Sequence, residues 1–189
     1  MLDRQGLIRS HSIHYRIANL THISVAVRDI PAGEELTVSY IDGMIHYAER
    51  QERLDSWGFK CACHVCSQGL PEIAASDARV KEIAKIEEDL EKKVGSGEEI
   101  PRDMGDKLVR LYEEEMLDNY LAHALTKAAL LASMVGDREK TREYALLAVE
   151  ALEREYGPGS KDEVAMLDLA DNMEEHWSWG IRMGGWKMG

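Results

Sequence analysis

The 189-residue sequence contains few of the residues that mark several broad classes of protein. It has 3 Cys, 4 Pro and 1 Phe, and its 15 Gly are an ordinary number for this length, which excludes collagen-like and low-complexity chains. No apolar run approaches the roughly 20 residues that a membrane-spanning helix needs. Residues 1–12 also lack the apolar stretch and the small-residue cleavage site of a signal peptide. We therefore expect an intracellular protein, nuclear or cytoplasmic, with a packed core.

Basic residues are outnumbered by acidic ones, chiefly in the second part of the chain. The whole sequence carries 23 Lys and Arg against 35 Asp and Glu, a formal net charge of −12. Residues 1–70 hold 7 of these bases and 8 of these acids, so residues 71–189 hold the remaining 16 and 27. A region with this excess of acids offers no basic surface for nucleic acid, and an anionic membrane surface would repel it. We expect neither as a partner, whereas a basic protein, such as a lysine-rich tail, is compatible with this charge.

The first 40 residues contain patterns typical of β-strands. Along residues 21–28 apolar side chains alternate with polar or small ones, which is the period of a strand with one buried face. Residues 13–18 predict a second strand, with a hairpin turn at residues 18–21 between the two. A turn at residues 31–33 then precedes a short run of β-branched and aromatic residues at 36–40. These features predict a small β segment of two or three strands.

From about residue 76 onward the apolar side chains recur with helical spacing. This pattern predicts five helices, with consecutive helices antiparallel and joined by short loops. Their expected boundary signals are Gly95 and Gly97, Pro101, Gly136 with Asp137, Gly157, and a capping box of Ser160 with Glu163. The apolar face expected for the fifth helix consists of Val164, Leu167, Ala170 and Met173. A shorter polar helix is predicted from Ile45 to about Ser56, ending at Gly58.

All three cysteines lie within six residues of the sequence. An odd number so tightly clustered is unsuited to a disulfide framework, and in an intracellular chain it indicates metal binding. Zinc prefers thiolates in a tetrahedron, and the spacing C-x-C-x2-C supplies three of them from one tight loop. Cys61, Cys63 and Cys66 are therefore predicted to bind zinc, with His64, a distant residue or water as the fourth ligand. The alternative is a chance cluster of three buried free cysteines.

These changes in pattern divide the chain into three segments: residues 1–56 with the strands, residues 57–70 with the cysteines, and helical residues 71–189. The fold class is α+β, with the short β segment first, then a zinc-binding loop, then a helical region of hairpins. The two helices on either side of Gly136 have nearly the 34-residue period of a tetratricopeptide hairpin. A plain helical bundle explains the same spacing equally well, so both interpretations stay open.

Three segments occur in an order that resembles the end of a SET domain and its post-SET segment. They are GEELTVSY at residues 33–40, a linking helix containing RQERL at residues 50–54, and WGFKCACHVC at residues 57–66. The SET family consists of protein-lysine methyltransferases that use S-adenosylmethionine. The acidic helical region further resembles the tetratricopeptide-like extension of fungal SET and MYND-SET proteins. The resemblance covers residues 13 to about 180.

The resemblance implies roles for several residues. Tyr40 would lie beside the methyl-transfer channel as a catalytic residue, where a phenol oxygen can orient a neutral lysine amine. Phe59 would pack on the adenine of S-adenosylmethionine, and Trp57 would anchor the cysteine loop to the core. The loop itself would be the lid that completes the lysine channel. The resemblance thus implies S-adenosylmethionine and zinc as cofactors and a basic protein as substrate.

One family motif is missing from the sequence. Family members carry N-H-x-C-x-P-N before the strand that residues 14–17 resemble, where it binds the cofactor and supplies the fourth zinc ligand. Residues 6–12 stand at that place and contain no Asn, Cys or Pro, and no G-x-G occurs before residue 95. We therefore expect the C-terminal part of a SET domain at residues 1–56, weakly active or inactive alone. The alternative is a non-enzymatic helical interaction module stapled by zinc.

Overall fold

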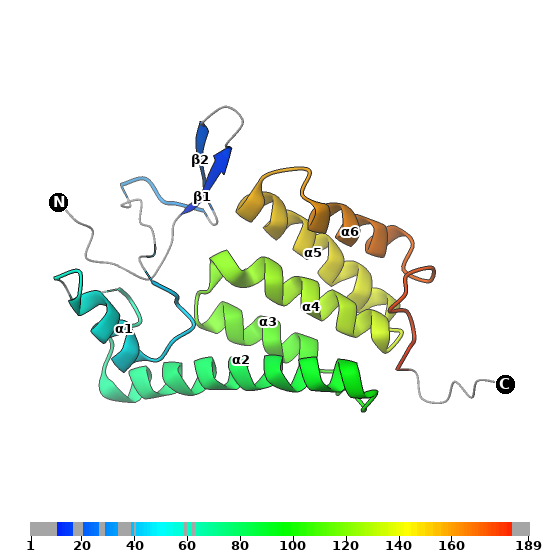
Figure 1. Ribbon diagram of the computed structural model, residues 1–189, viewed down its shortest axis with the longest axis horizontal. Coiled ribbons are helices and arrows are strands. Elements are labelled where there is room, and N and C mark those ends of the chain that lie inside the picture. The colour runs from blue at the N-terminus through cyan, green and yellow to red at the C-terminus, as the bar shows by residue number, and fades with distance from the viewer. Residues whose placement is uncertain are drawn as a thin grey trace.

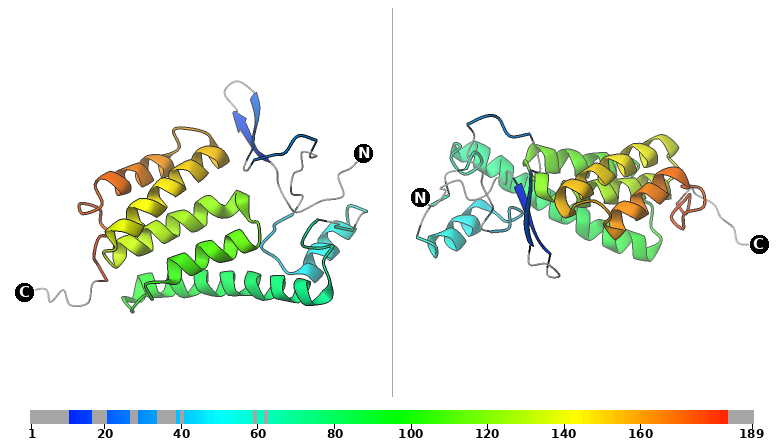
Figure 2. Two further views of the ribbon diagram at one scale, coloured as in Figure 1. Left: turned by 180° about the vertical axis from the view of Figure 1, so that it is seen from behind. Right: turned by 90° about the horizontal axis from the view of Figure 1, so that it is seen from above.

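Helices account for most of the chain that the structure describes. The computed structural model describes residues 11–16, 21–26, 29–33, 39, 41–58, 60, 61 and 63–182. In chain order the elements are β1 (His11–Arg16), β2 (Thr21–Ala26), α1 (Tyr47–Asp55), α2 (Leu70–Ser96), α3 (Met104–Glu114), η2 (Asp118–Tyr120), α4 (Leu121–Met134), α5 (Arg138–Tyr156) and α6 (Lys161–Asp171). The hairpin and α1 lie at one end of the helical bundle, and the turn after α6 lies at the other (Figure 1, Figure 2). Within the described residues, no helix combines the length and the apolarity that crossing a bilayer requires.

The two strands form an antiparallel hairpin, as the alternating pattern predicts. His11 pairs with Ala26 at one end of the ladder, and Arg16 pairs with Thr21 at the other. The hairpin contacts α5, and a two-stranded ribbon needs such packing because it is only marginally stable by itself. The third predicted strand, at residues 36–40, lies outside the described residues except for Ser39, which is not part of a strand.

Helices α2 to α6 run back and forth and form the main core (Figure 1). Helix α4 packs against both α3 and α5, and α5 also packs against α6. Small side chains let these helices approach closely, and the fully buried ones include Ala124, Ala129, Ala145 and Ala148. Gly105 of α3 marks a close approach to α4, because a Cβ atom there would lie 3.1 Å from the Cα atom of Ala128. Backbone moves aside less readily than the end of a side chain, so a residue larger than glycine would push α3 and α4 apart by a few tenths of an ångström here.

Several helix boundaries follow local signals in the sequence. Asp137 caps α5 by accepting a hydrogen bond from the Lys140 amide. Helix α4 ends before Gly136, whose φ of 69° lies in the left-handed region that favours glycine. Ser160 and Glu163 form the predicted capping box at the start of α6, in which each side chain accepts a hydrogen bond from the other's amide. These caps pair amides that have no partner inside the helix.

Helix α2 begins earlier than the sequence pattern predicts. It starts at Leu70 rather than near residue 76. Pro71 fits the first turn of a helix, because the amide donor that proline lacks has no partner there in any case. Leu70 is 82% exposed, but Ile73 is buried and stands seven residues before buried Val80, so the apolar spacing extends further back than the predicted start.

The buried face of α6 also differs from the prediction. Val164 and Leu167 are 59% and 39% exposed, so placing them in the core was wrong. Met166 and Leu169 are buried instead, together with the correctly predicted Ala170 and Met173. Helix α6 packs chiefly against α5, so one side of the helix is covered and its other apolar side chains face outward.

This register of α6 predicts different results for two leucines in the same helix. Leu169→Ala removes a fully buried side chain and should lower the free energy of unfolding by about 2–4 kcal/mol. Leu167→Ala removes a side chain that already contacts water and should cost less than about 1 kcal/mol. Urea unfolding followed by circular dichroism measures both values. Equal losses of stability would contradict the register.

The segment before α1 is held against the bundle. The Tyr120 hydroxyl donates a hydrogen bond to Asp42 Oδ1 at 3.0 Å, and the Met44 side chain packs against the main core. The Tyr47 amide donates to Asp77 Oδ1 of α2 at 2.7 Å, so the start of α1 is fixed to α2. These contacts position the helix that leads into the cysteine loop.

A polar cluster joins α2, α3 and α4. Glu87 Oε1 accepts hydrogen bonds from the Tyr112 hydroxyl at 2.8 Å and from Lys127 Nζ at 3.1 Å, and His123 Nε2 lies 3.2 Å from it. Burial by itself raises the pKa of Glu87. The hydrogen bonds from His123, Tyr112 and Lys127 together outweigh burial and lower the pKa to about 2. The ionised carboxylate therefore stabilises the junction of three helices.

Because the pKa of Glu87 lies below its ordinary value of 4.5, its contribution to stability is fully present above about pH 4.5. The contribution is lost as the pH falls towards 2. Glu87→Gln cannot titrate, so its free energy of unfolding should fall less over this range, by about 1–3 kcal/mol. Urea titrations at a series of pH values measure the difference. The control is Glu91→Gln, at an exposed position of the same helix, which should keep the wild-type pH dependence of stability. If Glu87→Gln also kept the wild-type pH dependence, the role of the Glu87 carboxylate in stability would be contradicted.

Candidate metal centre

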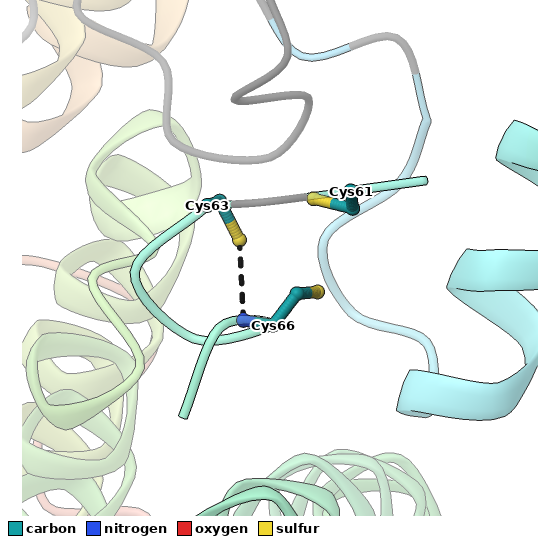
Figure 3. A group of neighbouring side chains, drawn as sticks. All are labelled: Cys61, Cys63 and Cys66. Atoms are coloured by element: carbon teal, nitrogen blue, oxygen red, sulfur yellow. Dashed lines mark hydrogen bonds between the residues drawn. The ribbon is translucent and has the colours of Figure 1, made fainter. Parts of the chain in front are cut away.

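The three cysteine side chains meet in the loop between α1 and α2. Their Sγ atoms all lie within 4.8 Å of one another, and the side chains border one shared space (Figure 3). Cys61, Cys63 and Cys66 are 6%, 0% and 7% exposed. A tetrahedral zinc ion with Zn–S bonds of about 2.3 Å holds its sulfurs about 3.8 Å apart. Separations of no more than 4.8 Å are compatible with binding of one zinc ion by the three sulfurs.

Contacts with α1 shape this loop. Gly58, with a φ of 78°, turns the chain just after the helix. The Gln51 side-chain oxygen accepts a hydrogen bond from the Cys61 amide at 3.2 Å, and Leu54 is fully buried against the cysteines. The partly buried side chains that cover this small core are Ile41, Tyr47 and Val65. The loop is thus packed on the helix that precedes it.

Hydrogen bonds among the thiols separate their pKa values. Bonds from the Cys61 thiol and then the Cys66 thiol lower the pKa of Cys63 to about 3. The bond to Cys63 raises the pKa of Cys61 to about 11, and bonds with Cys61 and Cys63 raise that of Cys66. The Cys66 amide also donates to Cys63 Sγ at 3.5 Å. A cation such as Zn²⁺ bound among the three sulfurs would keep all of them deprotonated.

His64 does not join the three sulfurs. Its imidazole is exposed, and its Nε2 atom lies 2.8 Å from Nε2 of Gln68. Within the described part of the chain, no imidazole or carboxylate extends the group formed by the cysteines. The geometry therefore gives no support to His64 as the fourth ligand and leaves water or a residue outside the described ranges.

Two residues singled out from the resemblance, Tyr40 and Phe59, lie outside the described residues. Tyr40 directly precedes Ile41, which packs against the cysteine cluster, and Phe59 stands two positions before Cys61. Trp57 is described and is 61% exposed, so it is not part of the core that it was expected to join.

One buried arginine in α1, the helix that precedes this loop, was not predicted from the sequence. Arg50 lies one helical turn before Leu54 in α1 and is 2% exposed. Its Nε and Nη2 atoms make no hydrogen bond in the described structure, and Nη2 lies 4.0 Å from Asp77 Oδ1. Burying a guanidinium in this way is costly. The only sequence signal was the four-residue spacing from Leu54, which places both side chains on one face of the helix.

Comparison with known proteins gives relatives of one kind, although no protein-family model matches the chain. The chain is 30% identical to histone-lysine N-methyltransferase set5 of Schizosaccharomyces pombe over 154 residues, which are 80% of this chain and 48% of that protein. It is 46% identical to histone-lysine N-methyltransferase ATXR2 of Arabidopsis thaliana over 44 residues, 23% of this chain and 9% of that protein. It is 44% identical to histone-lysine N-methyltransferase SET5 of Candida albicans over 48 residues, 24% of this chain and 10% of that protein.

These relatives are SET-domain histone-lysine methyltransferases, and the chain is related to them. This relation confirms the resemblance drawn from residues 33–40 and 57–66. The chain spans about half the length of the Schizosaccharomyces pombe protein, and this partial coverage is consistent with the C-terminal part of a SET protein. The buried cysteine cluster makes a post-SET zinc site plausible on chemical grounds.

The geometry predicts a single zinc site formed by the three thiolates. Cys63→Ser should remove nearly all bound zinc, because the sulfur that the other two thiols contact is lost. His64→Ala should retain zinc, because its imidazole is not part of the group. Atomic emission after gel filtration measures zinc per chain, and circular dichroism verifies that each variant is folded. Retention of zinc by Cys63→Ser, or its loss from His64→Ala, would contradict the assignment.

Proposed function

We propose that this chain is the C-terminal part of a protein-lysine N-methyltransferase that uses S-adenosylmethionine. The proposed domains are the end of the SET domain at residues 1–56, the zinc-binding post-SET segment at residues 57–70, and a helical, tetratricopeptide-like region at residues 71–189. The observation that carries the proposal is the convergence of three thiols at the spacing of a post-SET segment. The relation to histone-lysine methyltransferases over 80% of the chain supports it. A nuclear or cytoplasmic location inside the cell follows from this function.

Zinc bound by Cys61, Cys63 and Cys66 would give the loop a fixed shape, since thiolates on one ion cannot move independently. Phe59 stands two positions before Cys61. Tyr40 directly precedes Ile41, which packs on the cysteines. A loop of fixed shape would therefore bring Phe59 and Tyr40 to the same region. We assign Phe59 to the adenine of the cofactor and Tyr40 to the orientation of the lysine amine. S-adenosylmethionine supplies the methyl group when it is bound.

A basic protein is the substrate class that the charge of the chain supports. Residues 71–189 carry 27 acids against 16 bases, and such a field attracts a lysine-rich segment and speeds its association. The named relatives act on histone lysine, and we extend that class of substrate to this chain. Neither nucleic acid nor a membrane surface suits the same charge.

A second function is favoured by one feature of the sequence. Residues 6–12 lack the Asn, Cys and Pro of the cofactor-binding motif, so the pocket for S-adenosylmethionine lacks part of its wall. A site that buries little of its ligand binds weakly. The cysteine loop and the helices need none of those residues. The chain would then act without catalysis, as a zinc-stapled module that binds a basic protein.

Calorimetric titration of S-adenosylmethionine into the zinc-loaded chain distinguishes these two functions. Saturable binding at micromolar cofactor, followed by methylation of a lysine-rich peptide, is expected of the enzyme. Tyr40→Phe should then lower the methylation rate about 10- to 100-fold, while Tyr156→Phe, a substitution of an exposed tyrosine in α5, should leave it unchanged.

The opposite result is equally informative. A titration without heat, from a chain that keeps its zinc and its helix content, would overturn catalysis by this chain and leave a binding module or a fragment of a longer enzyme. Failure of the folded chain to bind zinc at all would overturn both functions, because each depends on the cysteine loop.

A further inference from the structure

A pocket of about 190 Å³ lies beside the cysteine loop, where the loop meets α2 and the end of α3. Val65 of the loop, Ala75 of α2 and Met116 after α3 contribute apolar walls. Pockets for drug-sized ligands have roughly 300–1,000 Å³. This pocket is smaller and has room for a single long side chain.

One wall of the pocket contains an ion pair between Arg79 and Glu115. Glu115 is buried, and its carboxylate accepts hydrogen bonds from Ser76 Oγ at 2.6 Å and from Arg79 Nε at 2.5 Å. All three residues line the pocket. Because the Glu115 carboxylate forms an ion pair with Arg79 at hydrogen-bond distance, the arginine adds no net positive charge to the wall.

The remaining charge at the pocket is negative. Glu72 and Glu114 line it and are exposed. Glu114 forms two loose ion pairs, 3.9 Å to Arg79 Nε and 3.8 Å to Arg110 Nε, both longer than a hydrogen bond. In the part of the chain that is described, the Glu72 carboxylate enters no salt bridge or hydrogen bond. The Glu72 carboxylate and the loosely paired Glu114 carboxylate are thus the acidic groups that a cation entering the pocket would meet.

A lysine or arginine side chain matches both features of this pocket. Its aliphatic stem suits the apolar walls, and its charged head suits the carboxylates. We propose that the pocket binds one lysine or arginine side chain of the basic protein substrate, at a position near the lysine that is modified. The location supports this, because Val65 lies between Cys63 and Cys66 in the loop assigned to the lid. The inference rests on the proposed function, which supplies the basic partner.

Fluorescence anisotropy on the zinc-loaded full chain tests the pocket, with a labelled synthetic peptide of lysine, arginine, alanine and glycine as the probe. The double variant Glu72→Gln, Glu114→Gln should weaken binding about 3- to 10-fold. The control pair Glu143→Gln, Glu150→Gln changes the net charge equally at exposed positions of α5 and should weaken it less than about 2-fold. Equal weakening by both pairs would overturn the pocket, because it would show attraction by the overall field alone.

A third variant tests entry into the pocket without a change of charge. Ala75→Phe places a ring at an exposed position of α2 that lines the cavity and should also weaken binding about 3- to 10-fold. Circular dichroism shows that each variant is folded. Undiminished binding by folded Ala75→Phe would overturn the pocket while leaving the basic partner in place. Absence of any peptide binding by the wild-type chain would overturn the proposed partner and, with it, this assignment.

Discussion

Close approach of helix backbones is the constraint on which the rest of this structure depends. A Cβ atom at Gly105 would lie only 3.1 Å from the Cα atom of Ala128, and Ala145 and Ala148 are completely buried where α5 packs. Dispersion contacts weaken steeply when surfaces separate by even 1 Å, so larger side chains here would cost packing along several helices. The short distances from Glu87 to α3 and α4 depend on the same spacing.

Helix α2 connects the helical bundle to the cysteine loop. It begins four residues after Cys66 and then makes polar contacts along its length. Asp77 binds the start of α1, Arg79 binds the end of α3, and Glu87 binds α3 and α4. A rigid helix with contacts at each of these points fixes where the loop can lie. Ordering of the loop by a metal would therefore also order the pocket beside it.

Local chemistry explains which features could be predicted from sequence. The capping box at Ser160, the cap at Asp137 and the turn at Gly136 each depend on a few neighbouring residues. The clustering of three thiols follows in the same way from a spacing of five residues, which holds the sulfurs together whatever surrounds them. The strand pairing of residues 11–26 was predictable because a hairpin joins neighbours in the chain. The sequence by itself thus determined the capped starts of α5 and α6, the end of α4, the hairpin and the cysteine cluster.

Burial was decided by the tertiary structure, because it depends on which distant segments cover a residue. Leu167 has the same apolar character as Leu169, but the covering of α6 on one side leaves the first exposed. Arg50 and Glu115 are charged residues that the sequence would place at the surface, and packing against other helices buries both. The pocket beside the loop likewise exists only where three elements meet. Short-range signals fix local geometry, whereas burial and charge pairing require partners that only folding brings near.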